Sequence, residues 1–399
     1  MVSGRQVESG NGPIRYGMVG GGQGAFIGAV HRIAARLDGE FQLVAGALSS
    51  DPARAKASAA DLGLDPERSY GSFADMAKAE ARRADGIEAV AIVTPNHMHY
   101  PAAKAFLDVG IPVICDKPLT STLADARKLC ALVEKSGQLF VLTHNYTGYP
   151  MVRQAREMVQ QGLLGELRVV QAEYPQDWLT NDIESSGQKQ AAWRTDPKQS
   201  GAGGSTGDIG THAYNLLRFV TQLEVDQLAA DLDHFVPGRR LDDNAHIMLR
   251  FKPVQAKGNI GHAAKGMVWA SQVAPGNENG LKLRVYGTKG GIEWTQADPN
   301  YLWYTPFGEP KRLITRAGAG ASPAAARVSR VPSGHPEGYL EGFATIYAEA
   351  ARAIRAMRKR GGKVPADVLY PTVYDGLDGV KFVDACVRSS AKNGAWVKL

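Results

Sequence analysis

The chain has 399 residues and the composition of a globular protein, with 44% hydrophobic and 22% charged residues, so we expect two domains rather than one core. Its formal net charge of +6 is spread along the sequence. The densest basic run, at 355–363, has the pattern of a solvated helix end, which argues against nucleic-acid binding.

The three cysteines fit neither a disulfide scaffold nor a thiolate metal site. Segment 1–13 is polar and glycine-rich, which excludes a secretory signal, and no apolar run is long enough to span a bilayer. We therefore expect a cytoplasmic protein that does not associate with membranes.

The first part of the chain alternates short apolar stretches with helical ones. The expected strands are 14–19, 41–48, 87–93, 112–115 and 139–143, and the expected helices are 25–37, a helix from Asp51-Pro52, 100–109 and 123–135. This alternation predicts βαβ units. Right-handed crossovers then give a doubly wound parallel sheet, an N-terminal Rossmann domain over residues 1–146.

After residue 146 the strands become longer and few helices separate them. We expect helix 151–161 and then strands 167–173, 227–235, 245–251, 266–273, 281–286 and 291–294, interrupted by long loops at 177–204 and 308–334 and followed by helices 338–358 and 372–390. This pattern predicts a C-terminal α/β domain over residues 147–399 with a large mixed or antiparallel sheet. A sheet with one helical face leaves the other free, and such a face commonly becomes an oligomer interface.

A glycine-rich turn follows the first strand and opens the first helix. Backbone N–H groups in such a turn can bind a pyrophosphate if side chains stay clear. Gly20 and Gly22 are placed for this contact, and the third glycine of the usual spacing falls at Ala25. The turn predicts a dinucleotide site, although glycine clusters also form ordinary turns.

The end of the second strand should distinguish NAD from NADP. An acid there would bind the ribose 2′-hydroxyl, and a nearby arginine would accept a 2′-phosphate. The chain has Leu48-Ser49-Ser50-Asp51, with Arg54 one turn later. Since Asp51 can simply cap a helix, both cofactors stay open, with NAD slightly preferred.

Lys117 lies where the fourth strand ends, directly before Pro118. The carboxyl ends of parallel strands line the crevice where ligands bind, so the Lys117 ammonium can stabilise an alkoxide that develops on a reacting oxygen. Thr94-Pro95-Asn96 ends the third strand, beneath the expected nicotinamide half. The alternatives are a surface lysine and a plain turn.

Asp208 and His212 are spaced i, i+4, which places them on one face of a helix. A histidine can take the proton of a hydroxyl group during oxidation, and an aspartate can orient that imidazole or bind a substrate hydroxyl. A surface turn and a metal site are the alternatives. Because no third ligand has a matching spacing, we expect no metal.

Together these motifs resemble the Gfo/Idh/MocA oxidoreductases, named for glucose–fructose oxidoreductase and inositol dehydrogenase. The matching stretches are Thr94-Pro95-Asn96-His97-Met98-His99, Val113-Ile114-Cys115-Asp116-Lys117-Pro118-Leu119 and Gly203-Gly204-Ser205-Thr206-Gly207-Asp208-Ile209-Gly210-Thr211-His212. The stretch 334–339 is similar to a subgroup of sugar dehydrogenases, which includes levoglucosan dehydrogenase.

The resemblance implies a Rossmann domain and a second domain whose sheet forms homodimers or homotetramers. It implies roles for Lys117 as catalytic lysine, Asp208 as substrate-orienting aspartate and His212 as general acid/base. Two departures stand out: Asp116 replaces the family's usual glutamate, and the glycine turn is about three residues longer than usual before His31.

We therefore expect an NAD(P)-dependent dehydrogenase that reversibly oxidises a ring hydroxyl of a sugar, anhydrosugar, glycoside or cyclic polyol. The expected cofactor-binding residues are Gly20, Gly22, Gln23, Ala25, Phe26, Ile27, Ser49, Ser50, Arg54, Thr94, Pro95, Asn96, His99, Asp116 and Lys117. The expected substrate-binding residues are Lys117, Asn145, Tyr146, Trp193, Arg194, Asp208 and His212. The alternatives are a non-catalytic sugar sensor that binds the dinucleotide, and an enzyme that keeps its cofactor bound and couples two sugars.

Overall fold

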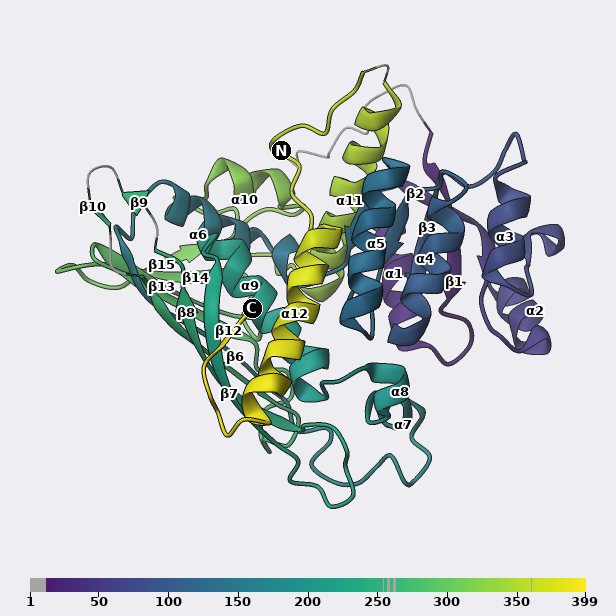
Figure 1. Ribbon diagram of the computed structural model, residues 1–399. Coiled ribbons are helices and arrows are strands. Elements are labelled where there is room, and N and C mark those ends of the chain that lie inside the picture. Colours follow the sequence, from purple (N-terminus) through teal and green to yellow (C-terminus); the bar gives the residue numbers. More distant parts are fainter. Residues whose placement is uncertain (1–11, 254, 257–258, 261–262, 360) are drawn as a thin grey trace. The chain divides into compact units, whose positions relative to one another are not determined.

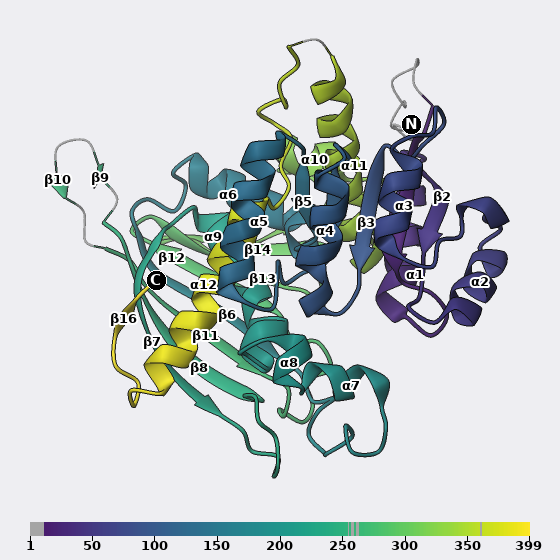
Figure 2. The same ribbon diagram turned by 45° about the vertical axis from the view of Figure 1, so that its right-hand side comes forward.

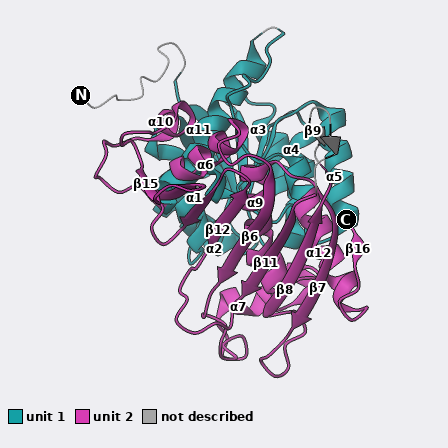
Figure 3. Cartoon of the chain, turned by 90° about the vertical axis from the view of Figure 1, so that its left-hand side faces the viewer, with its two compact units in different colours: residues 1–148, 339–377 teal, residues 149–338, 378–399 magenta. Residues whose placement is uncertain are grey.

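A computed structural model describes residues 12–253, 255–256, 259–260, 263–359 and 361–399. Residues 1–11 of the polar N-terminal stretch lie outside the described residues, as does His262, for which the sequence favours a packing or surface position. The chain forms two compact units (Figure 3): unit 1 comprises Met1–Gly148 and Tyr339–Leu377, and unit 2 comprises Tyr149–Gly338 and Asp378–Leu399. No helix among the described residues combines the length and hydrophobicity that crossing a bilayer requires.

Unit 1 confirms the predicted parallel Rossmann sheet (Figure 1). Its strands are β1 (Ile14–Gly20), β2 (Phe41–Ala47), β3 (Ala89–Val93), β4 (Val113–Cys115) and β5 (Phe140–Leu142), in the order β2-β1-β3-β4-β5. Its helices are α1 (Phe26–Leu37), α2 (Pro52–Asp61), η1 (Pro66–Arg68), α3 (Phe73–Glu80), η2 (Asn96–Met98), α4 (His99–Leu107), α5 (Leu123–Ser136), η3 (Asn145–Gly148) and α11 (Tyr339–Arg358).

Helix α11 lies far from the other elements of unit 1 in the sequence, yet it packs beside α1. Together they cover one face of the sheet, with side chains such as Val30 from α1 and Phe343 and Ile354 from α11 meeting Met18 and Ala91 from the strands. On the other face α4 lies beside α3 and α5 (Figure 2). The buried apolar area on both faces is the main stabilising contribution to this unit.

Two helix starts in unit 1 follow ordinary capping chemistry. Asp51 accepts a hydrogen bond from the Arg54 amide at 2.7 Å and Pro52 is the first residue of α2, as expected from the sequence. Helix α3 was not predicted, although its cap was visible: the Ser72 hydroxyl accepts from the Asp75 amide at 3.1 Å.

Unit 2 is built around a mixed sheet with the order β15-β14-β13-β12-β6-β11-β8-β7-β16. Its strands are β6 (Leu167–Pro175), β7 (Val225–Asp233), β8 (Asn244–Phe251), β11 (Lys265–Ser271), β12 (Lys282–Gly287), β13 (Gly290–Thr295), β14 (Tyr301–Pro306), β15 (Arg312–Thr315) and β16 (Val397–Lys398), beside a short hairpin of β9 (Gln255–Ala256) and β10 (Asn259–Ile260). Only β6 and β11 pair in parallel within the large sheet; its other described strand pairs are antiparallel.

The helices of unit 2 are α6 (Pro150–Gln160), α7 (Lys189–Arg194), α8 (Pro197–Ser200), a π-helical turn η4 (Thr206–Gly210), α9 (Thr211–Thr221) and α10 (Pro323–Val328). Helix α12 (Val373–Ser390) begins in unit 1 and ends in unit 2. The segments expected to be loops at 177–204 and 308–334 thus contain α7 and α8 in the first case, and β15 and α10 in the second.

The two faces of the large sheet differ in burial. Helix α9 packs on β6, β11 and β12, where Val170, Val268 and Leu283 are buried. Alternate residues on the opposite face, such as Met248 and Met267, are about half exposed, at 53% and 48%. Figure 3 shows β12, β6, β11, β8 and β7 side by side. The chain thus has a broad sheet face with exposed apolar side chains.

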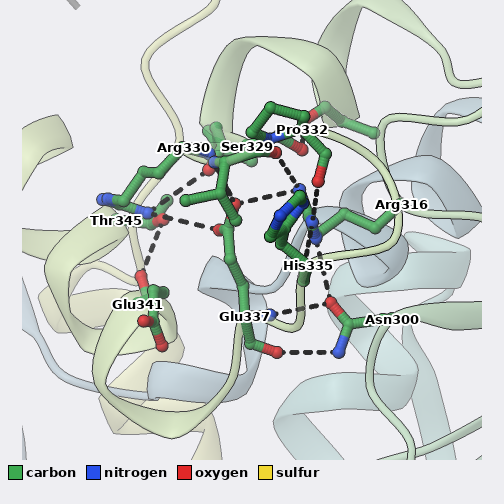
Figure 4. A network of polar contacts seen from close by, with 12 residues as sticks. Asn300, Arg316, Ser329, Arg330, Pro332, His335, Glu337, Glu341 and Thr345 are labelled. Carbon is green, nitrogen blue, oxygen red and sulfur yellow. Dashed lines mark hydrogen bonds and ion pairs between the residues drawn. The ribbon is translucent and has the colours of Figure 1, made fainter. Parts of the chain in front are cut away.

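A buried ion pair anchors the second long segment of unit 2 (Figure 4). Arg316 and Glu337, both 2% exposed, lie 3.0 Å apart, and Glu337 also accepts from the amides of Arg330 and Val331. The Arg316 guanidinium donates to the carbonyl of Val331 at 2.7 Å and to the Asn300 side chain at 2.9 Å. Because both charges find several partners, the pair can be buried without an uncompensated charge.

Candidate functional site

The carboxyl ends of the five parallel strands in unit 1 lie along one edge of the sheet. Gly20 ends β1, Thr94 follows β3, and Asp116-Lys117 follow β4. Thr143 to Asn145 follow β5. All five strands are parallel, but the order in which the chain adds them to the sheet reverses between β1 and β3. Crevices at such switch points are where doubly wound sheets bind ligands.

The glycine turn differs from the prediction in one respect. A Cβ atom on Gly28 would lie 2.4 Å from the Gly21 Cα atom, so Gly28 allows α1 to approach the turn after β1. This close packing is the role of the third glycine in a dinucleotide fingerprint. The expectation that Ala25 takes that place is wrong, because the longer turn shifts the helix start and moves the close contact to Gly28.

The residues that lengthen this turn are held by helix α2. The Gln23 amide donates to the Ser58 hydroxyl at 3.0 Å, and the Gln23 side chain donates to Asp61 at 2.7 Å. A Cβ atom on Gly22 would lie 2.7 Å from the Leu48 carbonyl oxygen, so a side chain there would collide with the segment after β2. The turn is therefore packed as well as glycine-rich.

Several features at this edge fit a bound dinucleotide. No side chain caps the N-terminus of α1 and its first turn has no acid, so its amides can receive a pyrophosphate. The hydroxyl of Thr94 and the side-chain amide nitrogen of Asn145 are buried without a hydrogen-bond partner among the described residues. Buried polar atoms are normally paired, so both have capacity for a ligand.

The end of β2 offers hydroxyl groups and an exposed arginine to an adenosine ribose. The Asp51 carboxylate caps α2, and the Asp51 amide donates to the Ser49 hydroxyl at 3.1 Å. Ser50 and Arg54 are exposed. The end of β2 could therefore bind either the ribose 2′-hydroxyl of NAD or the 2′-phosphate of NADP. Phe26, expected to contact the cofactor, is 69% exposed at the start of α1.

Asp116, which directly precedes Lys117, is held by hydrogen bonds from its side chain and its backbone. It accepts from the Thr143 hydroxyl at 2.9 Å, and its own amide donates to the Ile92 carbonyl at 2.8 Å. Burial raises its pKa, but the nearby His31 ring and the charges of Lys117 and His99 outweigh that effect and lower the pKa to about 2. Asp116 is therefore a carboxylate near neutral pH, adjacent in sequence to the Lys117 ammonium.

His99 and His144 flank this carboxylate and are both buried. The two ring nitrogens of His99 lie 2.8 Å from the Pro118 carbonyl oxygen and 2.9 Å from the Thr94 carbonyl oxygen. His99 therefore joins the segments after β3 and β4, and this arrangement favours a positioning role over the expected cofactor contact. For His144, burial and the Lys117 charge lower the pKa to about 3, so its ring is neutral.

Asn145 and Tyr146, expected to contact substrate, lie in η3 and are 2% and 3% exposed. The Lys117–Pro118 peptide bond is cis. Lys117 and Pro118 are partly exposed, as are Thr94 and Pro95, whereas Asn96 is buried.

In unit 2, Asp208 and His212 do not share one regular α-helix. Asp208 lies in the π-helical turn η4, and His212 in the first turn of α9. The expected i, i+4 pair in one α-helix is therefore wrong in its local geometry, although the two residues remain consecutive along one helical path. Single π turns in helices are frequent at functional sites.

Asp208 is oriented by two side chains. Gln272 donates to it at 2.9 Å, and the Arg194 guanidinium lies 3.4 Å from the same oxygen. The His212 ring centroid lies 6.2 Å from that of Tyr174, whose hydroxyl donates to Asn279 at 2.7 Å. Gln272, which was not among the expected site residues, directly follows Ser271, the last residue of β11.

Arg194 lies on α7 beside two tryptophans. Its guanidinium carbon is 4.3 Å from the Trp193 ring centroid and 6.0 Å from that of Trp178. Trp193, expected to contact substrate, thus packs against the neighbouring Arg194 of its own segment. The arginine thereby joins the α7 segment to Asp208.

A buried carboxylate holds the glycine-rich stretch before η4. Asp242 accepts from the amides of Gly204 and Thr206 and from the hydroxyls of Ser205 and Thr206, each at 2.7 Å. A Cβ atom on Gly204 would lie 2.0 Å from the Asp242 carbonyl oxygen, which explains the glycine. Within the described parts of the chain, no three His, Cys, Asp or Glu residues are grouped as a metal site would require.

Two family models match the sequence. The model described as an oxidoreductase family with an NAD-binding Rossmann fold matches residues 14–144, and the GFO/IDH/MocA C-terminal domain matches residues 152–293. The uncharacterized oxidoreductase YfiI of Bacillus subtilis (strain 168) is 35% identical over 401 residues, spanning 100% of this chain and 99% of that protein. The levoglucosan dehydrogenase of Pseudarthrobacter phenanthrenivorans is 26% identical over 411 residues, spanning 96% and 97%.

Solved structures agree with this relationship. An oxidoreductase from Sinorhizobium meliloti is 66% identical, with a TM-score of 0.88 over 97% of this chain and 100% of that chain. An inositol dehydrogenase homolog from Azotobacter vinelandii, in complex with NADH and myo-inositol, is 34% identical, with a TM-score of 0.89 over 97% and 98%.

Proposed function

Because the chain belongs to the Gfo/Idh/MocA family of oxidoreductases, we propose that it is an NAD(P)-dependent dehydrogenase acting on a ring hydroxyl of a sugar, anhydrosugar, glycoside or cyclic polyol. The observation that carries the proposal is Lys117, at the carboxyl end of β4 beside the ionised Asp116. A cation there has the chemistry to stabilise an oxygen that gains negative charge.

The proposed steps divide the chemistry among three side chains. The nicotinamide, when bound, accepts a hydride from the carbinol carbon. Lys117 hydrogen-bonds the hydroxyl oxygen and stabilises its developing charge, while the His212 imidazole takes the hydroxyl proton. Asp208, itself oriented by Gln272, orients the substrate and the imidazole. In the reverse direction His212 returns the proton.

NAD is the slightly preferred cofactor. The cradle of backbone amides at α1 and the hydroxyls of Ser49 and Ser50 suit the NAD pyrophosphate and ribose, and the solved inositol dehydrogenase homolog was obtained with NADH. The exposed Arg54 keeps NADP as the alternative, and a relative from Haloarcula marismortui is a D-xylose 1-dehydrogenase that uses NADP.

An unphosphorylated ring is the proposed substrate. The sequence has no second glycine-rich or arginine-rich phosphate site, and relatives along the whole chain include a levoglucosan dehydrogenase. Asn145, Tyr146 and Arg194 are the further proposed substrate contacts; the unpaired amide nitrogen of Asn145 supports the first of them.

The exposed face of the large sheet supports a homodimer or homotetramer. Val169, Met248 and Met267 on the neighbouring strands β6, β8 and β11, and Trp303 on β14, are exposed on that face, and a second copy of this chain would bury them. Light scattering of the Met248→Glu variant would test this: the proposal expects dissociation into smaller species, and an unchanged mass would contradict it.

The activity is tested by the rate of reduced-cofactor formation with inositols, free pyranoses, glycosides and levoglucosan, using NAD and NADP in parallel. Lys117→Met and His212→Gln should abolish turnover. The matched controls are Lys104→Met, which removes an exposed ion pair with Asp108, and His234→Gln at an exposed position. Cofactor binding without turnover on any substrate would instead favour a sensor, or an enzyme whose cofactor stays bound.

A further inference from the structure

A histidine that the proposed chemistry does not use lies directly behind Asp116. His31 is fully buried in α1, with its Nδ1 atom 2.8 Å from the Tyr347 hydroxyl oxygen and its Nε2 atom 3.6 Å from Asp116 Oδ1. Tyr347 lies in α11, and its ring meets the His31 ring edge-on at 5.8 Å. These residues come from three distant parts of the sequence but belong to one unit.

The chemistry of the three groups fixes the direction of the contacts. At 3.6 Å the His31 Nε2 atom lies just beyond hydrogen-bond distance of Asp116, and it has no hydrogen-bond partner among the described residues. Because a carboxylate only accepts hydrogen bonds, we expect the Nε2 atom that faces it to carry a proton. In a neutral imidazole Nδ1 then has the lone pair, and Tyr347 must donate its O–H to it. Burial and the charges of Tyr16 and Asp116 raise the pKa of Tyr347 well above its usual range, so the phenol keeps this proton.

We propose that Tyr347 and His31 are positioning residues, which hold the Asp116 carboxylate ionised and oriented beside Lys117 through the chain Tyr347 O–H to His31 Nδ1 and His31 Nε2–H to Asp116. The inference rests on the proposed dehydrogenase function only in its kinetic consequences. Neither residue need touch cofactor or substrate.

The other groups around Asp116 do not replace this support. Among the described residues, six titratable groups interact electrostatically with Asp116: His31 on α1, His99 on α4, Tyr347 on α11, Cys115 on β4, His144 after β5 and the adjacent Lys117. His99 directs both ring nitrogens at backbone carbonyls, and the buried His144 is neutral. Thr143 supplies one hydroxyl. His31 is the strongest influence that lowers the Asp116 pKa against burial.

Three variants test the kinetic consequence. We expect Tyr347→Phe to lower kcat about three- to tenfold, because one neutral hydrogen bond sets the His31 tautomer. His31→Leu should lower kcat about 10- to 100-fold, since it removes the imidazole N–H that faces the charged Asp116 carboxylate. His31→Gln, which can place an amide N–H toward Asp116, should recover part of this loss.

The pH profile separates positioning from a loss of structure. Removing His31 removes the strongest influence that lowers the Asp116 pKa, so this pKa should rise and the acidic limb of kcat should move to higher pH in His31→Leu. The KM for substrate and the Kd for the dinucleotide should stay close to wild type. Tyr16→Phe is the matched control: its ring lies 6.5 Å from that of Tyr347 in the same buried cluster, and it loses a hydroxyl without affecting the His31 contact.

The tautomer is a readout that needs no turnover. Nitrogen-15 NMR of labelled wild-type protein should show His31 neutral with the proton on Nε2, and Tyr347→Phe should shift part of the population to the Nδ1 tautomer. A wild-type proton on Nδ1, or Tyr347→Phe kinetics equal to those of Tyr16→Phe, would overturn the proposal. Absence of dehydrogenase activity with the predicted tautomer present would overturn the proposed function instead.

Discussion

The close contact at Gly28 gives a sharp test of how the glycine turn is built. In Gly28→Ala the new methyl group would lie 2.4 Å from Gly21 Cα and 2.7 Å from its carbonyl oxygen, which are backbone atoms that cannot rotate away. Extra methyl groups in packed sites cost about 1–3 kcal/mol, and the better helix propensity of alanine offsets about 1 kcal/mol. Because the clash is with backbone atoms, the upper part of this range, about 2–3 kcal/mol, applies. We therefore expect a net destabilisation of α1 and its turn of about 1–2 kcal/mol.

Dinucleotide binding should weaken with it, because the displaced turn carries the amides that receive the pyrophosphate. A loss of about tenfold in affinity for NADH corresponds to about 1.4 kcal/mol. Fluorescence titration with NADH measures the affinity, and hydrogen exchange of α1 measures the local stability. All six tryptophans lie in unit 2, so their emission shows whether unit 2 is unaffected.

Gly379→Ala is the matched control for this experiment. It also replaces a glycine within a helix, α12, but the new methyl group would meet only the Thr211 methyl group at 3.9 Å. It should be neutral or stabilise by up to about 1 kcal/mol. If Gly28→Ala matched this control in both stability and NADH affinity, the close packing of α1 on the turn would be refuted.

Three further predictions concern other parts of the site. Asp242→Asn should leave either the Gly204 or the Thr206 amide without an acceptor and destabilise unit 2 by about 1–3 kcal/mol, which urea unfolding followed by tryptophan emission would show; an unchanged stability would contradict the structural role of Asp242. Gln272→Leu should lower kcat/KM severalfold with unchanged NADH affinity, since it frees Asp208; equal kinetics would exclude Gln272 as an orienting group. The pKa of His144 is lowered to about 3 in the folded protein, so below about pH 6.5 this histidine binds a proton in the unfolded chain but not in the folded one. The free energy of unfolding of unit 1 should therefore fall by about 2 kcal/mol between pH 7 and pH 5. Hydrogen exchange at the two pH values measures this stability, and the decrease should be smaller in His144→Gln.

Local patterns in the sequence were sufficient to predict the Rossmann sheet. Its strands are short apolar runs that begin and end at turn residues, and the Asp51-Pro52 start of α2 follows from local capping. Lys117 was placed correctly at a strand end because strand direction fixes where such residues lie. Helix α3 was missed, although the Ser72–Asp75 cap was a usable signal.

The features that local patterns could not predict depend on contacts distant in sequence. The packing of α11 against α1 depends on a segment that follows the whole second sheet, and the His31–Tyr347 hydrogen bond joins residues 316 positions apart. The role of Gly28 was hidden because the longer turn broke the usual glycine spacing. The π turn at Asp208 was also not predictable, since an i, i+4 spacing alone fits an α-helix equally well.

The central claim is that a hydride passes from a carbinol carbon to the nicotinamide. The most direct measurement uses a substrate found in the sugar panel, deuterated at the carbon that is oxidised, and mass spectrometry of the reduced cofactor. We predict that wild-type protein transfers one deuterium to the nicotinamide ring, while Lys117→Met still binds NADH but transfers none. Substrate and cofactor binding without deuterium in the cofactor would contradict the dehydrogenase assignment.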